Sequence, residues 1–334
     1  MKITFFEASP QEQVTLTGLL PNIELAFFEE KLSKKNAVAT AGSDVVSVFI
    51  NSEVKKDVID LMTGVKLIVT RSTGFDHVDV VYAKQKGIQV ANVPSYGSRT
   101  VAEFTFGLIL NLSRNIFQAR HQLLENGNFD IHRLQGFDLY GKTLGVIGTG
   151  KIGKNVIKIA QAFEMKVVAT DMYPDEAFAK ERGFSYLPLE QLLAQADIVT
   201  LHTPYTKESH HLINGNNIGM MKKGAYLVNT ARGELVETEA LIDALNTGYL
   251  SGAGLDVLED ERQLREETEI LKHTTTQSQN FKTLFENHLL MNHARVILTP
   301  HIAFFTKEAM KEISTTTAGN IQAFIKGTPQ NILT

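Results

Sequence analysis

The chain has 334 residues, a formal net charge of −4, 43% hydrophobic and 21% charged residues, and no cysteine. These values are typical of a globular protein, and the length favours two domains. They give no reason to expect a nucleic-acid partner, and they exclude disulfides, thiolate nucleophiles and cysteine-bound metals. The N-terminal segment does not match a secretory signal, and no apolar run approaches the roughly 18 residues of a membrane span. We therefore expect a cytoplasmic protein with no membrane partner.

Short apolar segments alternate with helical patterns in the first hundred residues. Strands are expected at 2–6, 44–50, 66–70 and 88–91, and helices near 53–62 and 78–86. This alternation predicts an α/β layer with a parallel sheet. A long helix is expected to begin near 99, where Thr100 and Glu103 fit a capping box. We expect this helix to lead out of the first unit.

A glycine-rich turn follows the next predicted strand, which begins at Thr143. Gly148, Gly150 and Gly153 give the pattern G-x-G-x-x-G, in which the glycines allow a tight turn, close approach of a pyrophosphate, and packing of helix on strand. The pattern alone is weak, because a glycine turn without a ligand is a common alternative. Asp171 strengthens it: this residue ends a second apolar strand 21 positions after Gly150 (171 − 150), where a carboxylate binds an adenosine ribose and repels a 2′-phosphate. The sequence therefore favours NAD over NADP.

Further apolar strands continue this second unit. They are expected at 197–202, 225–230, 251–256 and 295–298. Each is too apolar to be half exposed, which predicts a sheet covered by helices on both faces. The polar segment 260–294 interrupts the rhythm and is expected to hold one or two surface helices with a flexible middle. A last helix, from Thr306 to Lys326, is expected to return to the first domain.

Three polar residues stand just past predicted strand ends, where open α/β sheets place ligands: Arg232, Glu261 and His301. Histidine, with an ordinary pKa of about 6.5, is suited to move the hydroxyl proton when a hydride passes between an alcohol carbon and a nicotinamide. A carboxylate on its far ring nitrogen fixes the tautomer and favours the imidazolium, and an arginine holds a substrate carboxylate. Taken singly, each residue has an alternative without a catalytic role. Arg232 could be a salt-bridge partner, Glu261 a solvated acid and His301 an ordinary loop residue. Their common position downstream of the glycine turn favours the catalytic interpretation.

The sequence resembles the D-isomer-specific 2-hydroxyacid dehydrogenases over almost its whole length. The resemblance rests on the glycine turn and on these segments: 71–79 (RSTGFDHVD), 93–96 (VPSY), 202–204 (HTP), 229–233 (NTARG), 254–257 (GLDV) and 300–304 (PHIAF). Tyr96 and the pair Phe304 and Phe305 are the residues that most resemble the lactate branch of the family. Two departures are Lys151, where many relatives have arginine, and the 40 positions from Glu261 to His301 (301 − 261), a longer interval than usual.

The resemblance implies two doubly wound parallel-sheet domains with a cleft between them. A flavodoxin-like substrate domain would comprise 1–98 and 299–334, and a Rossmann NAD-binding domain 99–298. The implied catalytic residues are Arg232, Glu261 and His301. The implied substrate-binding residues are Thr73, Gly74, Tyr96, Arg232 and His301. The implied cofactor-binding residues are Gly148, Gly150, Lys151, Ile152, Gly153, Asp171, Thr203, Pro204, Thr230, Ala231, Arg232 and Asp256.

The expected activity is reversible hydride transfer between NADH and a 2-oxo acid, which gives the D-2-hydroxy acid. Pyruvate, which gives D-lactate, is the first candidate substrate. Two alternatives stay open: a dehydrogenase for bulkier 2-oxo acids such as phenylpyruvate or 2-oxoisocaproate, and an NAD-sensing interaction protein of the same fold. A homodimer is implied by the resemblance. No metal is expected, because His210 and His211, if adjacent on a helix, would point about 100° apart.

Overall fold

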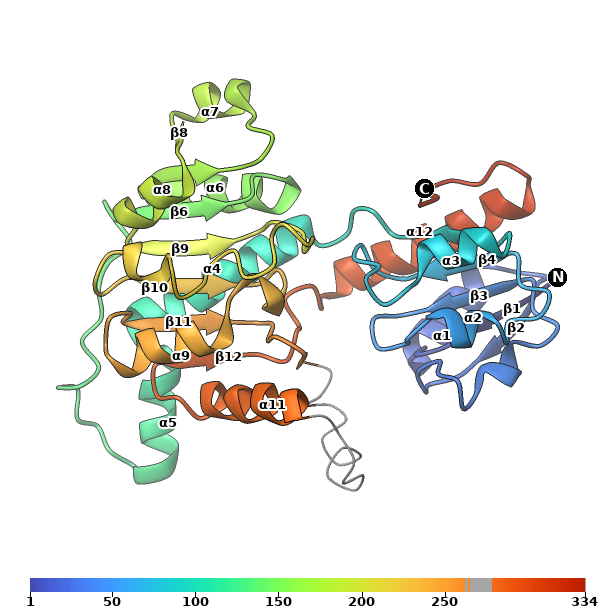
Figure 1. Ribbon diagram of the computed structural model, residues 1–334, viewed down its shortest axis with the longest axis horizontal. Helices are drawn as coiled ribbons and strands as arrows, with labels where there is room; N and C mark the ends of the chain where they lie inside the picture. Colours follow the sequence, from blue (N-terminus) through green and yellow to red (C-terminus); the bar gives the residue numbers. More distant parts are fainter. Residues whose placement is uncertain (262–263, 265–277, 334) are drawn as a thin grey trace. The chain divides into compact units, whose positions relative to one another are not determined.

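The computed structural model describes residues 1–261, 264 and 278–333, and it divides the chain into two compact units. Unit 1 is Met1–Gly97 with Phe305–Thr334, and unit 2 is Ser98–Phe304. Both units are coloured by sequence in Figure 1. The predicted boundaries at 98 and 299 are wrong by a few residues, because residue 98 and residues 299–304 belong to unit 2. His301 therefore lies in the same unit as the glycine turn.

Unit 1 contains a five-stranded parallel sheet with helices on both faces. Its strands are β1 (Lys2–Phe5), β2 (Glu24–Phe27), β3 (Val45–Val48), β4 (Leu67–Thr70) and β5 (Gln89–Ala91). Its helices are α1 (Pro10–Leu19), η1 (Ala37–Thr40), α2 (Lys56–Ile59), α3 (Val80–Gln85) and α12 (Lys307–Ile325). The strand order β2-β1-β3-β4-β5 is that of the flavodoxin-like fold, which confirms the predicted class.

Two separate apolar cores cover the two faces of this sheet. Val58, Ile59 and Ala83 of α2 and α3 belong to one core, and Leu16 of α1 and Ile321 of α12 belong to the other. The last helix therefore packs in unit 1, as the sequence predicts. The strand β2 and the helix α1 were not expected. The residues of β2 are only half-buried or exposed, and α1 buries a single residue, so neither carries a strong apolar pattern.

Unit 2 contains a seven-stranded parallel sheet. Its strands are β6 (Thr143–Ile147), β7 (Lys166–Thr170), β8 (Ser185–Tyr186), β9 (Ile198–Leu201), β10 (Tyr226–Asn229), β11 (Gly252–Leu255) and β12 (Val296–Leu298). Its helices are α4 (Ser98–Arg114), α5 (Ile116–Asn126), α6 (Lys151–Ala162), α7 (Glu176–Arg182), α8 (Leu189–Gln195), η2 (Ile218–Met220), η3 (Gly233–Leu235), α9 (Thr238–Asn246) and α11 (Ser278–Met291).

The strand order β12-β11-β10-β9-β6-β7-β8 reverses direction between β6 and β9, as in a Rossmann fold. Helices α8 and α9 cover one face of the sheet and α4 and α6 the other, as Figure 1 shows. Every residue of β9 and β11 is buried, which confirms the prediction of a sheet covered on both sides. Carboxyl ends of parallel strands meet at one edge of a sheet, so the residues that follow β6, β9, β10, β11 and β12 gather there.

Three helix predictions need comment. The long helix α4 begins at Ser98, so Thr100 lies inside its first turn and is not a capping residue. Helix α11 is not a purely surface helix, because Leu284, Asn287 and Leu290 are buried. The predicted flexible middle of 260–294 falls mostly outside the described residues. Among the described residues, no helix combines the length and the apolar character that a membrane crossing requires.

Candidate active site

The glycine turn joins β6 to α6 in a conformation that needs its glycines. Gly148 has φ 92°, a left-handed value, and a Cβ there would lie 2.7 Å from the backbone carbon of His202. A Cβ on Gly153 would lie 2.0 Å from the carbonyl oxygen of Gly148, so only glycine lets α6 pack this close to the turn. Gly150 is the N-cap of α6 and supplies no side-chain cap. The first N–H groups of α6, with Lys151 at its first position, are therefore suited to hold a pyrophosphate.

Asp171 follows β7 and faces this turn. Its Oδ2 accepts hydrogen bonds from the N–H and the hydroxyl of Thr149, at 2.5 and 2.9 Å, and its Oδ1 accepts from the N–H of Tyr173 at 2.8 Å. Burial opposes ionisation of Asp171, but these hydrogen bonds and the charge of Lys154 together lower its pKa. The carboxylate is thus ionised at neutral pH and fixed to the turn, and the turn and the carboxylate together fit a dinucleotide.

Thr203 and Pro204 follow β9 on the other side of the turn. Thr203 is half-buried and Pro204 exposed, and a Cβ on Gly148 would lie 2.8 Å from the N of Thr203. Thr230, at the end of β10, is buried and shares a hydrogen bond of 3.0 Å between hydroxyl groups with Thr105 of α4. Thr203, Pro204 and Thr230 therefore follow β9 and β10, at the same edge of the sheet as the glycine turn.

His301 and Glu261 form a hydrogen-bonded pair. The Nδ1 of His301 lies 2.6 Å from Oε1 of Glu261, and both side chains keep about a quarter of their surface exposed, 20% and 29%. This contact orients the ring through Nδ1 and leaves Nε2 as the nitrogen that can exchange a proton with another group. The structure brings together two of the three predicted catalytic residues across 40 positions of sequence. The arrangement is that of a general acid or base oriented by a carboxylate.

Asp256 holds the loop that carries His301. Its Oδ1 accepts from the Thr299 hydroxyl at 2.5 Å and from the N–H of Ile302 at 2.9 Å, and its Oδ2 accepts from the N–H of Ala303 at 2.8 Å. His301 itself has φ 56°, an uncommon conformation for a residue with a side chain. Burial raises the pKa of Asp256, although its hydrogen bonds act in the opposite direction. The family resemblance implies that Asp256 binds the cofactor, and no spacing rule in the sequence reveals its hydrogen bonds to the His301 loop.

Arg232 lies in the loop after β10, close to the backbone of the loop after β11. Asn229 shapes the loop: its amide N–H donates to the carbonyl of Arg232 at 2.7 Å, and its Oδ1 accepts from the N–H of Ala231 at 3.0 Å. A Cβ on Gly233 would lie 1.9 Å from the carbonyl carbon of Leu258, so glycine is needed for the two loops to pack. The Nη1 of Arg232 donates to the carbonyl of Ala231 at 2.7 Å. Arg232 therefore lies on the loop that packs beside the segment leading to Glu261.

The predicted substrate-binding residues of unit 1 lie in a loop after β4 and in a segment after β5. The hydroxyl of Thr73 donates to the carbonyl of Val93 at 2.8 Å, and the amide N–H of Asn92 donates to the carbonyl of Thr73 at 2.9 Å. The hydroxyl of Ser72 donates to the carbonyl of Gly74 at 2.6 Å. Tyr96 is half-buried. The loop is therefore held by its own hydrogen bonds before any substrate arrives.

His202 is a buried histidine outside the predicted site residues. It is 9% exposed, its Nε2 lies 3.0 Å from the Thr200 hydroxyl, and its Nδ1 has no hydrogen-bond partner among the described residues. Burial lowers its pKa from 6.5 to about 3. The imidazole is therefore neutral at every pH at which the protein is expected to work.

This buried imidazole predicts a loss of stability in acid. The unfolded chain binds a proton on His202 near pH 6.5 and the folded chain only near pH 3, so acidification between these values favours unfolding. The contribution is about 1.4 kcal/mol of unfolding free energy per pH unit. Urea unfolding at several pH values is expected to show a shallower acid slope for His202→Gln than for the unchanged chain. Equal slopes would mean that His202 binds its proton over the same pH range in the folded and the unfolded chain, and would contradict the lowered pKa.

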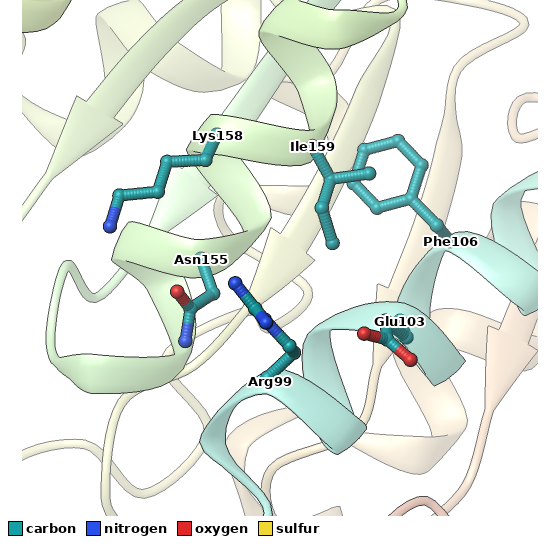
Figure 2. Close-up of a pocket in the computed structure, with 6 residues that line it drawn as sticks. All are labelled: Arg99, Glu103, Phe106, Asn155, Lys158 and Ile159. Atoms are coloured by element: carbon teal, nitrogen blue, oxygen red, sulfur yellow. The ribbon is translucent and has the colours of Figure 1, made fainter.

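A cavity of about 260 Å³ lies between α4 and α6. Figure 2 shows that Arg99 of α4 and Asn155 of α6 point toward the same space, beside Glu103 and Lys158. None of the predicted site residues lines this cavity. The cavity is therefore separate from the residues that the sequence predicts to form the site.

The strand order, the glycine turn with its fixed carboxylate, and the carboxylate-oriented histidine define a dinucleotide-dependent dehydrogenase. Comparison with known proteins gives the family. Residues 106–303 match the family model of the D-isomer specific 2-hydroxyacid dehydrogenase, NAD binding domain. The chain belongs to this family and is an NAD-dependent 2-hydroxyacid dehydrogenase.

Three relatives show the extent of the similarity. A D-lactate dehydrogenase of Escherichia coli is 39% identical over 306 residues, which cover 91% of this chain and 90% of that protein. The crystal structure of a D-lactate dehydrogenase from Aquifex aeolicus, complexed with NAD and lactic acid, superposes with a TM-score of 0.86 at 36% identity and covers 98% of this chain and 96% of its own. An aromatic 2-oxoacid reductase of Clostridium sporogenes is 37% identical over 297 residues, which cover 87% and 86% of the two chains. The relatives thus include proteins named for different substrates.

Proposed function

We propose that this enzyme is a D-lactate dehydrogenase, which reduces pyruvate with NADH and runs in reverse with D-lactate. The observation that carries the proposal is the contact of 2.6 Å between His301 and Glu261 at the strand ends of an NAD-binding unit. Relatives named D-lactate dehydrogenase over more than nine-tenths of the chain support the choice of substrate.

The proposed roles follow from the chemistry of the side chains. When bound, NADH supplies the hydride that reduces the carbonyl carbon. His301 donates a proton from Nε2 to the carbonyl oxygen, and Glu261 keeps the ring oriented through Nδ1. Arg232 binds the carboxylate of the 2-oxo acid through its planar guanidinium. Thr73, Gly74 and Tyr96 of unit 1 are proposed to bind the same substrate, and Asp256 holds the His301 loop.

A dehydrogenase for bulkier 2-oxo acids is the second candidate. The relative from Clostridium sporogenes named as an aromatic 2-oxoacid reductase favours it, because its identity to this chain is close to that of the lactate enzymes. A dinucleotide-sensing protein of the same fold is the third candidate. The oriented His301 disfavours it, since a sensor has no use for a proton donor held by a carboxylate.

A steady-state assay with several 2-oxo acids separates the three candidates. Pyruvate, phenylpyruvate and 2-oxoisocaproate are each reduced with NADH and followed by its absorbance. The highest kcat/KM for pyruvate supports the proposal, and the highest value for phenylpyruvate or 2-oxoisocaproate supports the second candidate. Negligible turnover of all three supports the sensor. Repeating the assay with NADPH tests Asp171, whose carboxylate is expected to repel the 2′-phosphate.

We propose that the enzyme is a homodimer that associates through the segment 116–140 of unit 2. Helix α5 has no buried residue, and large apolar side chains along the segment are exposed, among them Leu124 (64%), Phe129 (86%) and Ile131 (75%). Apolar groups gathered in this way mark association surfaces. Light scattering of the purified protein tests the proposal, and a monomeric mass would refute it. A cytoplasmic location stays a prediction from the sequence.

A further inference from the structure

His210, His211 and Glu259 form a cluster outside the proposed catalytic set. Among residues 1–261, 264 and 278–333, this is the group of three side chains whose potential metal-ligand atoms all lie within 4.8 Å of one another. His210 is exposed, and His211 and Glu259 are half-buried. The cluster is therefore open to solvent on one side and fixed to the fold on the other.

The two histidines do not lie on a helix, and the expectation that their side chains diverge is wrong. They belong to the turn that follows β9, and His211 has φ 50°, a left-handed value. This conformation brings the imidazole rings together: their centroids are 3.8 Å apart and their planes differ by 23°. The argument against a metal pair therefore no longer applies to this turn.

The carboxylate of Glu259 is held in place from several sides. Its Oε1 lies 2.8 Å from Nε2 of His211, and its Oε2 accepts from the Thr238 hydroxyl at 2.8 Å. Its backbone carbonyl accepts from the amide N–H of Asn287, also at 2.8 Å. Hydrogen bonds of this kind orient the ligands of known metal sites. Glu259 and His211 are thus fixed with a nitrogen and an oxygen facing each other.

Negative charge gathers around the cluster. Asp260 follows Glu259 in the chain, and the charge of Glu259 acts on its carboxyl group. The backbone carbonyl of Glu234 accepts the N–H of His211 at 2.8 Å. A cation placed among these carboxylates lowers their mutual repulsion. The electrostatic surroundings therefore favour a metal ion.

We propose that His210, His211 and Glu259 bind Zn²⁺ through two imidazole nitrogens and one carboxylate oxygen. Zn²⁺ takes such ligands at about 2.0–2.2 Å in a tetrahedral arrangement, which places ligand atoms about 3.3 Å apart. His211 and Glu259 need to separate by only about half an ångström to meet this geometry. The exposed ring of His210 stacks on His211 and meets Tyr205 edge to face, and in the proposed site it rotates off this stack so that a ring nitrogen reaches the metal, with water as the fourth ligand. Imidazole ligands favour Zn²⁺ over Mg²⁺ or Ca²⁺.

Calorimetric titration of the full chain with Zn²⁺ tests the proposal, after treatment with a chelator and without dinucleotide or substrate. We expect one Zn²⁺ per chain, with affinity at least roughly tenfold lower in His210→Asn, because a ligand is lost. The substitution is at an exposed position, and an unchanged circular dichroism spectrum will show that the fold is retained. Equal affinity of His210→Asn and the unchanged chain would overturn the proposal.

Two control variants show where the ion binds. His121 and Glu125 form a two-residue pair on α5, with 3.1 Å between Nε2 and Oε2, and His301 and Glu261 form the pair of the active site. His121→Asn and His301→Asn are each expected to retain the affinity of the unchanged chain. If either control variant loses Zn²⁺ binding while His210→Asn retains it, the ion binds elsewhere in the chain and the proposal is refuted.

Co²⁺ gives a spectroscopic readout of the same site. A four-coordinate Co²⁺ that replaces Zn²⁺ absorbs visible light far more strongly than the hydrated six-coordinate ion. We expect this absorption in the unchanged chain and its loss in both His210→Asn and Glu259→Gln. A weak spectrum like that of the hydrated ion in the unchanged chain would contradict the proposed ligand set. Neither measurement depends on dehydrogenase activity, so the site and the proposed substrate are tested separately.

Discussion

Replacing His301 by alanine is expected to lower kcat for the 2-oxo acid by roughly 10²–10⁴, the usual effect of removing a general acid. The reason is geometric: Glu261 holds Nδ1 of the ring at 2.6 Å, and in the proposed mechanism Nε2 donates the proton to the substrate. Stopped-flow or steady-state assays by NADH absorbance give kcat directly. Glu261→Gln is expected to have a smaller effect, because an amide still accepts a hydrogen bond from Nδ1.

NADH binding is the internal control for this variant. Within the described part of the chain, the glycine turn and Asp171, at β6 and β7, are hydrogen-bonded to each other and His301 is hydrogen-bonded to Glu261. NADH affinity, read by fluorescence, is therefore expected to stay nearly unchanged. His288→Ala serves as a matched control, since His288 is a histidine of unit 2 on α11. An unchanged kcat in His301→Ala would remove this residue from the mechanism and with it the proposed role of Glu261.

Strong apolar patterns in the sequence predicted most of the fold. Strands buried on both faces, such as β9 and β11, read as continuous apolar runs, and their positions were predicted to within a residue or two. The edge strands β2 and β8 were missed. An edge strand is paired on one side only, and β2 has no buried residue, so its sequence shows little apolar character. Helix α1 was missed because it buries only Leu16, so its sequence also shows little apolar pattern.

Those parts of the candidate site that follow from residue type and from position after a strand could be predicted from the sequence. His301 and Glu261 were assigned together from their positions and from family resemblance, and the structure places them in contact. The hydrogen bonds of Asp256 to the backbone of the His301 loop could not be predicted, because they depend on the left-handed conformation of a residue that is not glycine. The stacking of His210 on His211 was missed for a similar reason. Backbone conformations that a sequence pattern does not encode decide both cases.

Replacing Arg232 by lysine is expected to raise KM for pyruvate by about 10- to 100-fold, the effect of losing one charge-assisted hydrogen bond. The guanidinium offers several N–H donors in one plane, so it can donate to the carbonyl of Ala231 through Nη1 and bind a carboxylate at the same time. An ammonium group keeps the charge but not this planar geometry. Steady-state kinetics measures KM, and the inhibition constant of oxamate, an analogue that is not reduced, is expected to rise by a similar factor.

Arg295→Lys is the matched control for the arginine substitution. Arg295 precedes β12 at the amino end of the sheet, opposite the edge where Arg232 follows β10, and its Nη1 also donates to a backbone carbonyl, that of Leu245, at 3.1 Å. Its replacement is expected to leave KM for pyruvate unchanged.

If Arg232→Lys also leaves KM and oxamate binding unchanged, Arg232 does not hold the substrate carboxylate, and the donors of Thr73, Gly74 and Tyr96 become the groups to test. A distorted loop after β10 would weaken the binding of both oxamate and NADH. If oxamate binding weakens while NADH affinity stays constant, the substitution has therefore impaired recognition of the substrate carboxylate.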